Sequence, residues 1–157
     1  MQKRITLTVP VHLQKFLLGE FRGEYTPKGA QIHVEKWAEL GKLIHLSSRH
    51  FPFPIAPAKV TGTTITISYY CREKCYEVPP EKYAELTRQL DEIFRRSLIC
   101  EVRRVHELVG GDYGKHIRSF MDRYQIEADV DVEFETIRKI YRDYLQRISQ
   151  KNRKILA

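Results

Sequence analysis

The sequence lacks the features that define several protein classes. Its 157 residues include only three cysteines, an odd number, and a single tryptophan. So few cysteines exclude the disulfide framework of small secreted proteins. No apolar run reaches the roughly 20 residues that span a bilayer, and the alternating residues after Arg4 do not form the apolar core of a secretory signal. We therefore expect a cytoplasmic protein without a membrane partner.

Signatures of metal binding and catalysis are also missing. Cys71 and Cys75 are spaced like half of a zinc site, but no second cysteine or histidine pair with ligand spacing follows them. The sequence contains neither a nucleophile elbow nor a glycine-rich phosphate loop. We therefore predict no metal site, no cofactor and no catalytic residue, and an enzyme is the least favoured function class.

A histidine-rich patch keeps an alternative open. His33, His45 and His50 lie close in sequence to Ser47 and Ser48. Histidine is the usual general base near neutral pH, and a neighbouring serine could serve as a nucleophile. No carboxylate lies in a recognisable motif with them, and the same residue types also contact nucleobases. Ordinary polar surface residues explain the patch as well as a site does.

The most regular pattern in the chain is an apolar repeat that steps by three and four residues. This spacing places all of its members on one side of a long α-helix. Pro79 and Pro80 suit the start of that helix, and Gly110 and Gly111 suit its end. We predict a helix over about 79–109, with this stripe buried. The stripe consists of Tyr83, Leu86, Leu90, Ile93, Phe94, Leu98, Val102, Val105, Leu108 and Val109.

The remaining patterns predict an α+β fold. A small mixed β/α half, residues 1–78, precedes an all-helical half, residues 79–157, and the two could share one core. In the helical half, the long helix is followed by two shorter ones, and residues after 150 are expected to fray. Phenylalanines of the proline-rich connector 51–57 are expected to enter the core. We predict strands over 3–9, 30–34 and 63–70 and helices over about 11–21, 35–49, 113–124 and 133–148.

The charge of the chain favours polyanionic partners. Its formal net charge is +7 at pH 7, and a basic chain attracts nucleic acid or an anionic surface. The stretch from Arg138 to Lys154 is the most basic, because its one acidic residue is Asp143.

The last two predicted helices resemble the helix-turn-helix family of DNA-binding motifs. The second of them carries Arg138, Lys139, Arg142 and Arg147. The resemblance implies that this helix enters the major groove and that its cations reach bases or phosphates. The linker before it, however, is long for the motif and carries acidic residues. The alternative is that acids near the helix start and bases near its end simply complement the helix dipole.

The first twenty residues resemble the start of a ribbon-helix-helix DNA-binding protein. Lys3 and Arg4 open an alternating strand that Pro10 ends, and an amphipathic helix follows. The resemblance implies a dimer whose paired strands present Arg4, Thr6 and Thr8 to base edges. This chain departs from the pattern after the first helix, where residues 25–29 form a turn. The alternative is an ordinary strand within a small sheet.

Two arginine pairs lie on the long helix, about two turns apart. Arg95-Arg96 and Arg103-Arg104 could follow a phosphate backbone, or they could form ion pairs with nearby glutamates on the same helix.

We therefore predict a nucleic-acid-binding protein, with DNA as the expected ligand, of the kind found among small regulatory or mobile-element and phage-type factors. The alternative is an assembly module that forms a homodimer through the long amphipathic helix. The two are compatible, since many DNA-binding proteins are dimers. The predicted nucleic-acid-binding residues are Lys3, Arg4, Arg95, Arg96, Arg103, Arg104, Arg138, Lys139, Arg142 and Arg147.

Overall fold

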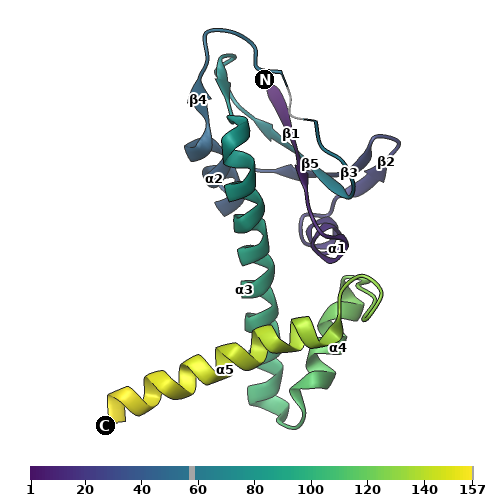
Figure 1. The fold of residues 1–157 in the computed structure, drawn as a ribbon, viewed down its shortest axis with the longest axis vertical. Helices are drawn as coiled ribbons and strands as arrows, with labels where there is room; N and C mark the ends of the chain where they lie inside the picture. Colours follow the sequence, from purple (N-terminus) through teal and green to yellow (C-terminus); the bar gives the residue numbers. More distant parts are fainter. Residues whose placement is uncertain (57–58, 157) are drawn as a thin grey trace. The chain divides into compact units, whose positions relative to one another are not determined.

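The computed structural model describes residues 1–56 and 59–156 and confirms the predicted α+β fold (Figure 1). The first half contains the strands and two helices, and the second half is helical. The strands are β1 (Gln2–Thr8), β2 (Glu24–Thr26), β3 (Gly29–Val34), β4 (Arg49–His50), β5 (Thr64–Tyr70) and β6 (Tyr76–Glu77). The helices are α1 (Val11–Glu20), α2 (Glu39–Ser47), α3 (Tyr83–Val109), which a short 3-10 turn over Pro80–Lys82 precedes, α4 (Tyr113–Arg123) and α5 (Phe134–Leu156).

The chain forms two compact units, Met1–Glu92 and Ile93–Ala157. The division falls within α3, so the first turns of this helix belong to the unit with the sheet and its later turns to the helical unit. Leu86 and Leu90 are buried in the first unit, and Phe94, Leu98 and Val102 are buried in the second.

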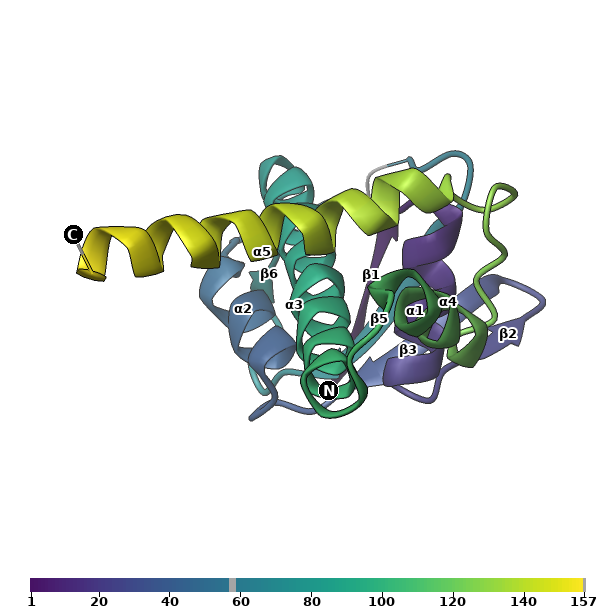
Figure 2. The same cartoon turned by 90° about the horizontal axis from the view of Figure 1, so that it is seen from below.

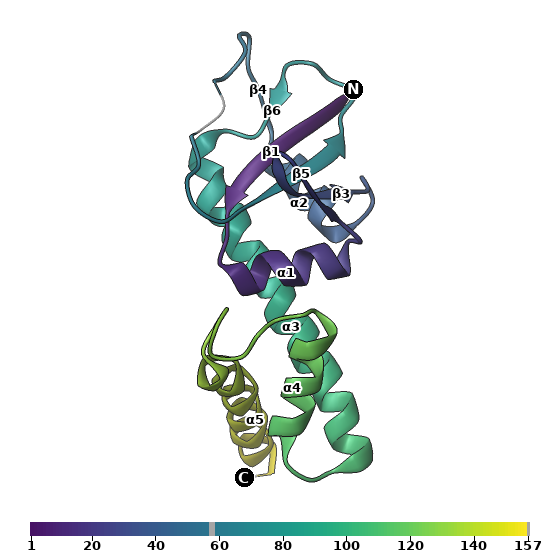
Figure 3. The same ribbon diagram turned by 90° about the vertical axis from the view of Figure 1, so that its right-hand side faces the viewer.

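The first unit is built on a four-stranded sheet with the order β1-β5-β3-β2. β5 pairs antiparallel with β1 and parallel with β3. Alternation within each strand sends the apolar side chains to one side, and α2 and the first turns of α3 lie behind the sheet in Figure 3. The opposite side carries polar residues and stays open. The buried side chains of the sheet include Ile5, Leu7, Ile32, Val34, Ile65 and Ile67.

The second unit consists of the later turns of α3 together with α4 and α5. Phe94 of α3 meets Phe120 of α4 with ring centroids 6.0 Å apart. Gly110 and Gly111 both have positive φ angles, 70° and 80°, and end α3 as the sequence predicted. α5 crosses α3, and its last turns continue beyond α3 (Figure 1 and Figure 2).

Two predictions for the segment around α2 are wrong. The helix begins at Glu39 rather than at residue 35, because Ala38 adopts an extended conformation. Trp37 therefore precedes the helix and is 74% exposed. Phe53 does not enter the core but is 78% exposed, because α2 and α3 already cover the apolar side of the sheet. Pro57 lies outside the described residues.

Two further predictions are wrong, namely where α5 ends and how far along α3 the apolar stripe is buried. α5 does not fray after residue 150 but continues to Leu156. The apolar stripe of α3 is buried only as far as Val102, and Leu108 is 86% exposed. The stripe ends early because the last turn of α3 presents His106, and not Leu108, to α4 and α5, where it contacts Tyr113 and Tyr141.

The burial of α3 can be tested with two matched leucines. We expect Leu90→Asp to lower the free energy of unfolding by more than about 4 kcal/mol, because it places an unpaired carboxylate in the core. Ile93→Asp, at a half-buried position, should cost less. Leu108→Asp should change the stability by less than about 0.5 kcal/mol. Urea denaturation followed by circular dichroism measures all three, and equal losses for Leu90 and Leu108 would contradict the helix register.

Candidate nucleic-acid interface

The acidic linker before α5 has a structural task. The Asp129 carboxylate accepts a hydrogen bond from the backbone amide of Phe134 at 3.0 Å, and Asp131 accepts one from the amide of Glu127 at 2.8 Å. These bonds fix the turn and satisfy a free amide at the start of α5. The acidic residues of the linker therefore stabilise the start of α5, as the alternative to a helix-turn-helix motif predicts. Their negative charge also makes the N-terminal end of α5 unsuitable for phosphate.

A cluster of aromatic and basic side chains holds α5 against α3. His106 Nδ1 of α3 lies 3.1 Å from the hydroxyl of Tyr141, and Arg103 donates a hydrogen bond to the hydroxyl of Tyr144 at 3.4 Å. The Tyr113 ring of α4 packs on the Tyr141 ring, with centroids 5.1 Å apart. These contacts fix the middle of α5 across α3 and leave its opposite side facing outward.

Arg103 and Arg138 belong to this cluster. Arg138 lies over the Tyr113 ring, 5.7 Å from its centroid, and donates to Glu135 at 3.2 Å. The hydrogen bond to Glu135 raises the pKa of Arg138, and the bond to Tyr144 raises the pKa of Arg103. Burial raises the pKa of Tyr141, so its phenol stays neutral. Both arginines thus act as structural cations of the helical unit.

The remaining cations of α5 are exposed along the helix, and we call this set the α5 basic face. Every member is exposed, and no ion pair joins a member to a carboxylate within residues 1–56 and 59–156. Asp143 is the one acidic residue in this stretch. The α5 basic face consists of Lys139, Arg142, Arg147, Lys151, Arg153 and Lys154.

The four arginines of the two α3 pairs do not share one environment, because some of them contact other side chains of the protein and some are exposed to solvent. Arg95 and Arg96 are exposed, but each has an interaction partner. Arg103 points to Tyr144, and Arg104 is exposed on the last turns of the helix. The α3 pairs therefore do not form one uninterrupted cationic stripe.

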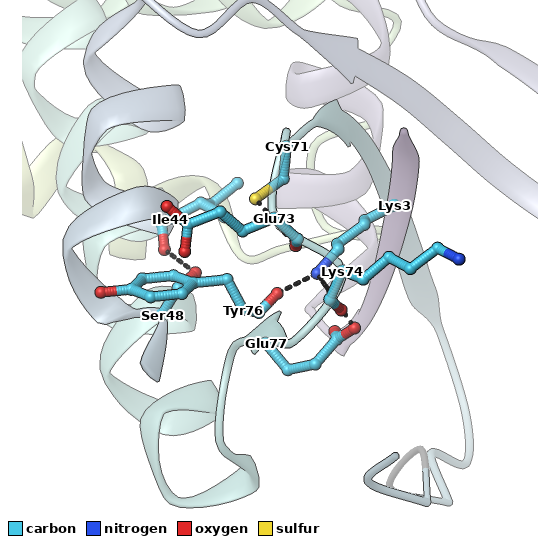
Figure 4. Close-up of polar contacts among 8 residues, drawn as sticks. All are labelled: Lys3, Ile44, Ser48, Cys71, Glu73, Lys74, Tyr76 and Glu77. Atoms are coloured by element: carbon cyan, nitrogen blue, oxygen red, sulfur yellow. Dashed lines mark hydrogen bonds and ion pairs between the residues drawn. The ribbon is translucent and has the colours of Figure 1, made fainter. Parts of the chain in front are cut away.

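Lys3 lies inside the first unit. Its ammonium donates to the carbonyls of Lys74 and Tyr76 and pairs with Glu77 at 3.2 Å (Figure 4). Since only 7% of Lys3 is exposed, its charge serves to join β1 to the segment that leads into β6 and is not available to a ligand.

Arg4 is exposed on the open side of the sheet, where it lies opposite Ser68. Thr6 shares this side and lies 3.0 Å from Thr66, hydroxyl to hydroxyl. β1 pairs with β5 of its own chain, as expected for the strand of a small sheet. The pairing of β1 therefore needs no second copy of the chain.

In the histidine-rich patch, His33 has other partners than His45 and His50, which both lie next to Tyr76. His33 on β3 lies 3.0 Å from the Ser68 hydroxyl and 4.0 Å from the Glu35 carboxylate, with both side chains of the ion pair more than half exposed. His45 instead stacks on Tyr76. Ser48 is buried and donates to the carbonyl of Ile44 (Figure 4). The patch does not converge on one cleft.

Residues 1–56 and 59–156 contain neither a candidate metal cluster nor a membrane-spanning helix. No group of three or more histidine, cysteine, aspartate or glutamate side chains there could hold a metal ion. None of the helices in these ranges combines the length and the apolar character that crossing a bilayer requires. Cys71, Cys75 and Cys100 are free thiols.

The chain was compared with known proteins at the levels of family, sequence and structure. No family model, no curated protein and no solved structure matches it.

Sequence reasoning named part of the α5 basic face and missed the rest. Lys139, Arg142 and Arg147 were predicted, whereas Lys151, Arg153 and Lys154 were assigned to a fraying end. Their charge was visible in the sequence. The missing signal was the length of α5, which the apolar residues Ile148 and Ile155 at helical spacing could have indicated.

The burial of Lys3 gives a matched test within one strand. We expect Lys3→Met to lower the free energy of unfolding by about 1–3 kcal/mol, because two carbonyls and one carboxylate lose a charged donor. Arg4→Met, at the exposed neighbouring position, should change stability by less than about 0.5 kcal/mol. Urea denaturation provides the measurement. Equal stabilities of the two variants would show that the Lys3 contacts contribute nothing.

Proposed function

We propose that the protein binds nucleic acid, with DNA as the expected ligand, through the α5 basic face. One observation carries the proposal: six exposed lysines and arginines without ion-pair partners lie along one helix that other contacts hold in place. Cations that no carboxylate neutralises are free to replace the counterions of a polyanion.

The geometry favours contacts to phosphates over contacts to bases. Lys139 and Lys154 are 15 residues apart on α5, which corresponds to about 22 Å of helix. Double-stranded DNA carries one charge per about 1.7 Å of axis, so several phosphates lie within that length. A recognition helix usually reads bases with its N-terminal residues, but Glu133 and Glu135 occupy that end of α5. Backbone contacts position a protein without reading sequence.

A small basic protein of this kind suits a regulatory or mobile-element and phage-type factor that acts on DNA in the cytoplasm. The free thiols of Cys71, Cys75 and Cys100 are in keeping with a reducing compartment.

The proposal predicts how charge reversal on α5 affects binding. We expect Lys139→Glu combined with Arg142→Glu to weaken binding to a generic DNA duplex by about tenfold or more at low salt. The slope of log affinity against log salt should fall by about two, because two phosphate contacts are lost. Fluorescence anisotropy of a labelled duplex measures both. Arg138 is left unchanged because it supports the helical unit.

The control variant is Lys28→Glu combined with Arg72→Glu, which reverses two exposed charges in the first unit. This variant has the same net charge as the α5 variant, so it separates a local contact from a general loss of charge. Equal weakening by both pairs would contradict an interface on α5. Absence of wild-type binding to duplex or to heparin at low salt would remove the proposal.

Assembly as a homodimer is the second candidate. The buried part of the α3 stripe, Leu86 to Val102, already packs inside its own chain, so the long helix offers a partner only its last turn. The observation that supports a homodimer is the exposure of three apolar residues near the end of α3, Val105, Leu108 and Val109. Light scattering at micromolar concentration tests it, since a dimer that Leu108→Asp disrupts would support assembly through this turn.

A further inference from the structure

The one tryptophan of the chain lies on the surface and lines a groove of about 450 Å³ in the first unit. Trp37 is 74% exposed and Leu46 is 79% exposed. Exposed apolar side chains that adjoin one another can mark a ligand-binding groove. The residues that line the groove are Lys36, Trp37, Lys42, His45 and Leu46.

A close approach of the backbone builds this groove. The carbonyl oxygen of Glu35 lies 2.1 Å from the position that a Cβ atom on Gly41 would take. Any side chain there would collide with this oxygen, so only glycine lets the 35–38 turn fold onto the first turn of α2. The Ala38 amide closes the turn by donating to the carbonyl of Glu35 at 3.1 Å. The turn holds the indole outside the core, beside the exposed side of α2.

The lining of the groove combines apolar side chains with two cations. Lys36 and Lys42 line it, and no carboxylate does. Neither lysine forms an ion pair with a described carboxylate. An occupant with an apolar body and negative charge therefore complements this surface.

Planar rings distinguish the groove from a simple hydrophobic patch. His45 lines it next to Trp37, and its imidazole stacks on the Tyr76 ring with centroids 6.0 Å apart and an angle of 22° between the planes. An indole and a held imidazole present flat π-surfaces, on which nucleobases stack irrespective of sequence. An extended acidic peptide would satisfy the lysines but would not need two flat rings.

We infer that the Trp37 groove binds an unpaired stretch of single-stranded nucleic acid. A base stacks on the Trp37 indole against Leu46, and Lys36 and Lys42 contact the flanking phosphates. This inference rests on the proposed function for its ligand class, but it concerns a separate surface and an unpaired strand rather than the phosphates that α5 contacts.

The chain carries its own probe for this site, because Trp37 is its one tryptophan. We expect a short oligothymidylate to quench the intrinsic fluorescence, after correction for absorption by the oligonucleotide. Lys36→Glu combined with Lys42→Glu should raise the apparent Kd of this quenching by about tenfold or more. The charge-matched pair Lys28→Glu and Arg72→Glu should leave it within about twofold.

A second readout tests the stacking itself. Anisotropy of a labelled oligothymidylate should show about tenfold or more loss of affinity for Trp37→Leu and a smaller loss for Trp37→Phe, which retains a ring. Equal losses for leucine and phenylalanine would overturn stacking as the mode of binding.

Separate outcomes distinguish this inference from the proposed function. Duplex binding without quenching by the oligonucleotide overturns the groove site alone. Quenching without duplex binding supports the groove and removes the α5 interface. Equal quenching by polyglutamate, or by thymidine monophosphate at the same nucleotide concentration, overturns the inference, because the groove would then take an acidic peptide or a free nucleotide.

Discussion

The burial of one side of α3 is the constraint on which both units depend. The helix contributes Leu86 and Leu90 to the core below the sheet and Phe94, Leu98 and Val102 to the helical core. An apolar stripe of this length must be covered by other parts of the chain. Burial of each leucine-sized side chain stabilises the folded state by about 1.5–3 kcal/mol relative to leaving it in water. One continuous element therefore ties together two cores that the chain builds from different secondary structures.

The packing of these two cores divides the lysines and arginines of the chain into cations that contact other protein groups and cations that stay exposed to water. Lys3, Arg103 and Arg138 become structural, because buried or half-buried cations need carbonyls, hydroxyls, rings or carboxylates around them. The cations of the α5 basic face stay in water with no such partner. Net charge alone does not separate the groups, although it draws attention to polyanionic ligands.

Local chemistry explains why several sequence predictions hold. Period-two alternation places Ile5 and Leu7 inward and Arg4 outward on β1, as predicted. Proline before α1 and the glycine pair after α3 mark helix ends because their backbone preferences act within a few residues. Phe53 is exposed against expectation, since an apolar side chain is buried only where the tertiary core has room for it. Of the ten predicted binding residues, Lys139, Arg142 and Arg147 lie together on the α5 basic face, whereas Lys3 and Arg138 do not share their exposure.

The sequence by itself determined the fold class, the strands β1, β3 and β5, the five helices apart from their exact ends, and the basic character of the last helix, because each follows from periodicity, caps and charge within a short segment. It did not predict the short strands β2, β4 and β6. The tertiary structure alone decided which cations stay exposed and where Trp37 lies. The place of Trp37 depends on a tight turn in which the Glu35 carbonyl lies against Gly41. The exposure of each cation depends on packing between distant segments, as where His106 meets Tyr141 across 35 positions of sequence. No local pattern carries information about such neighbours.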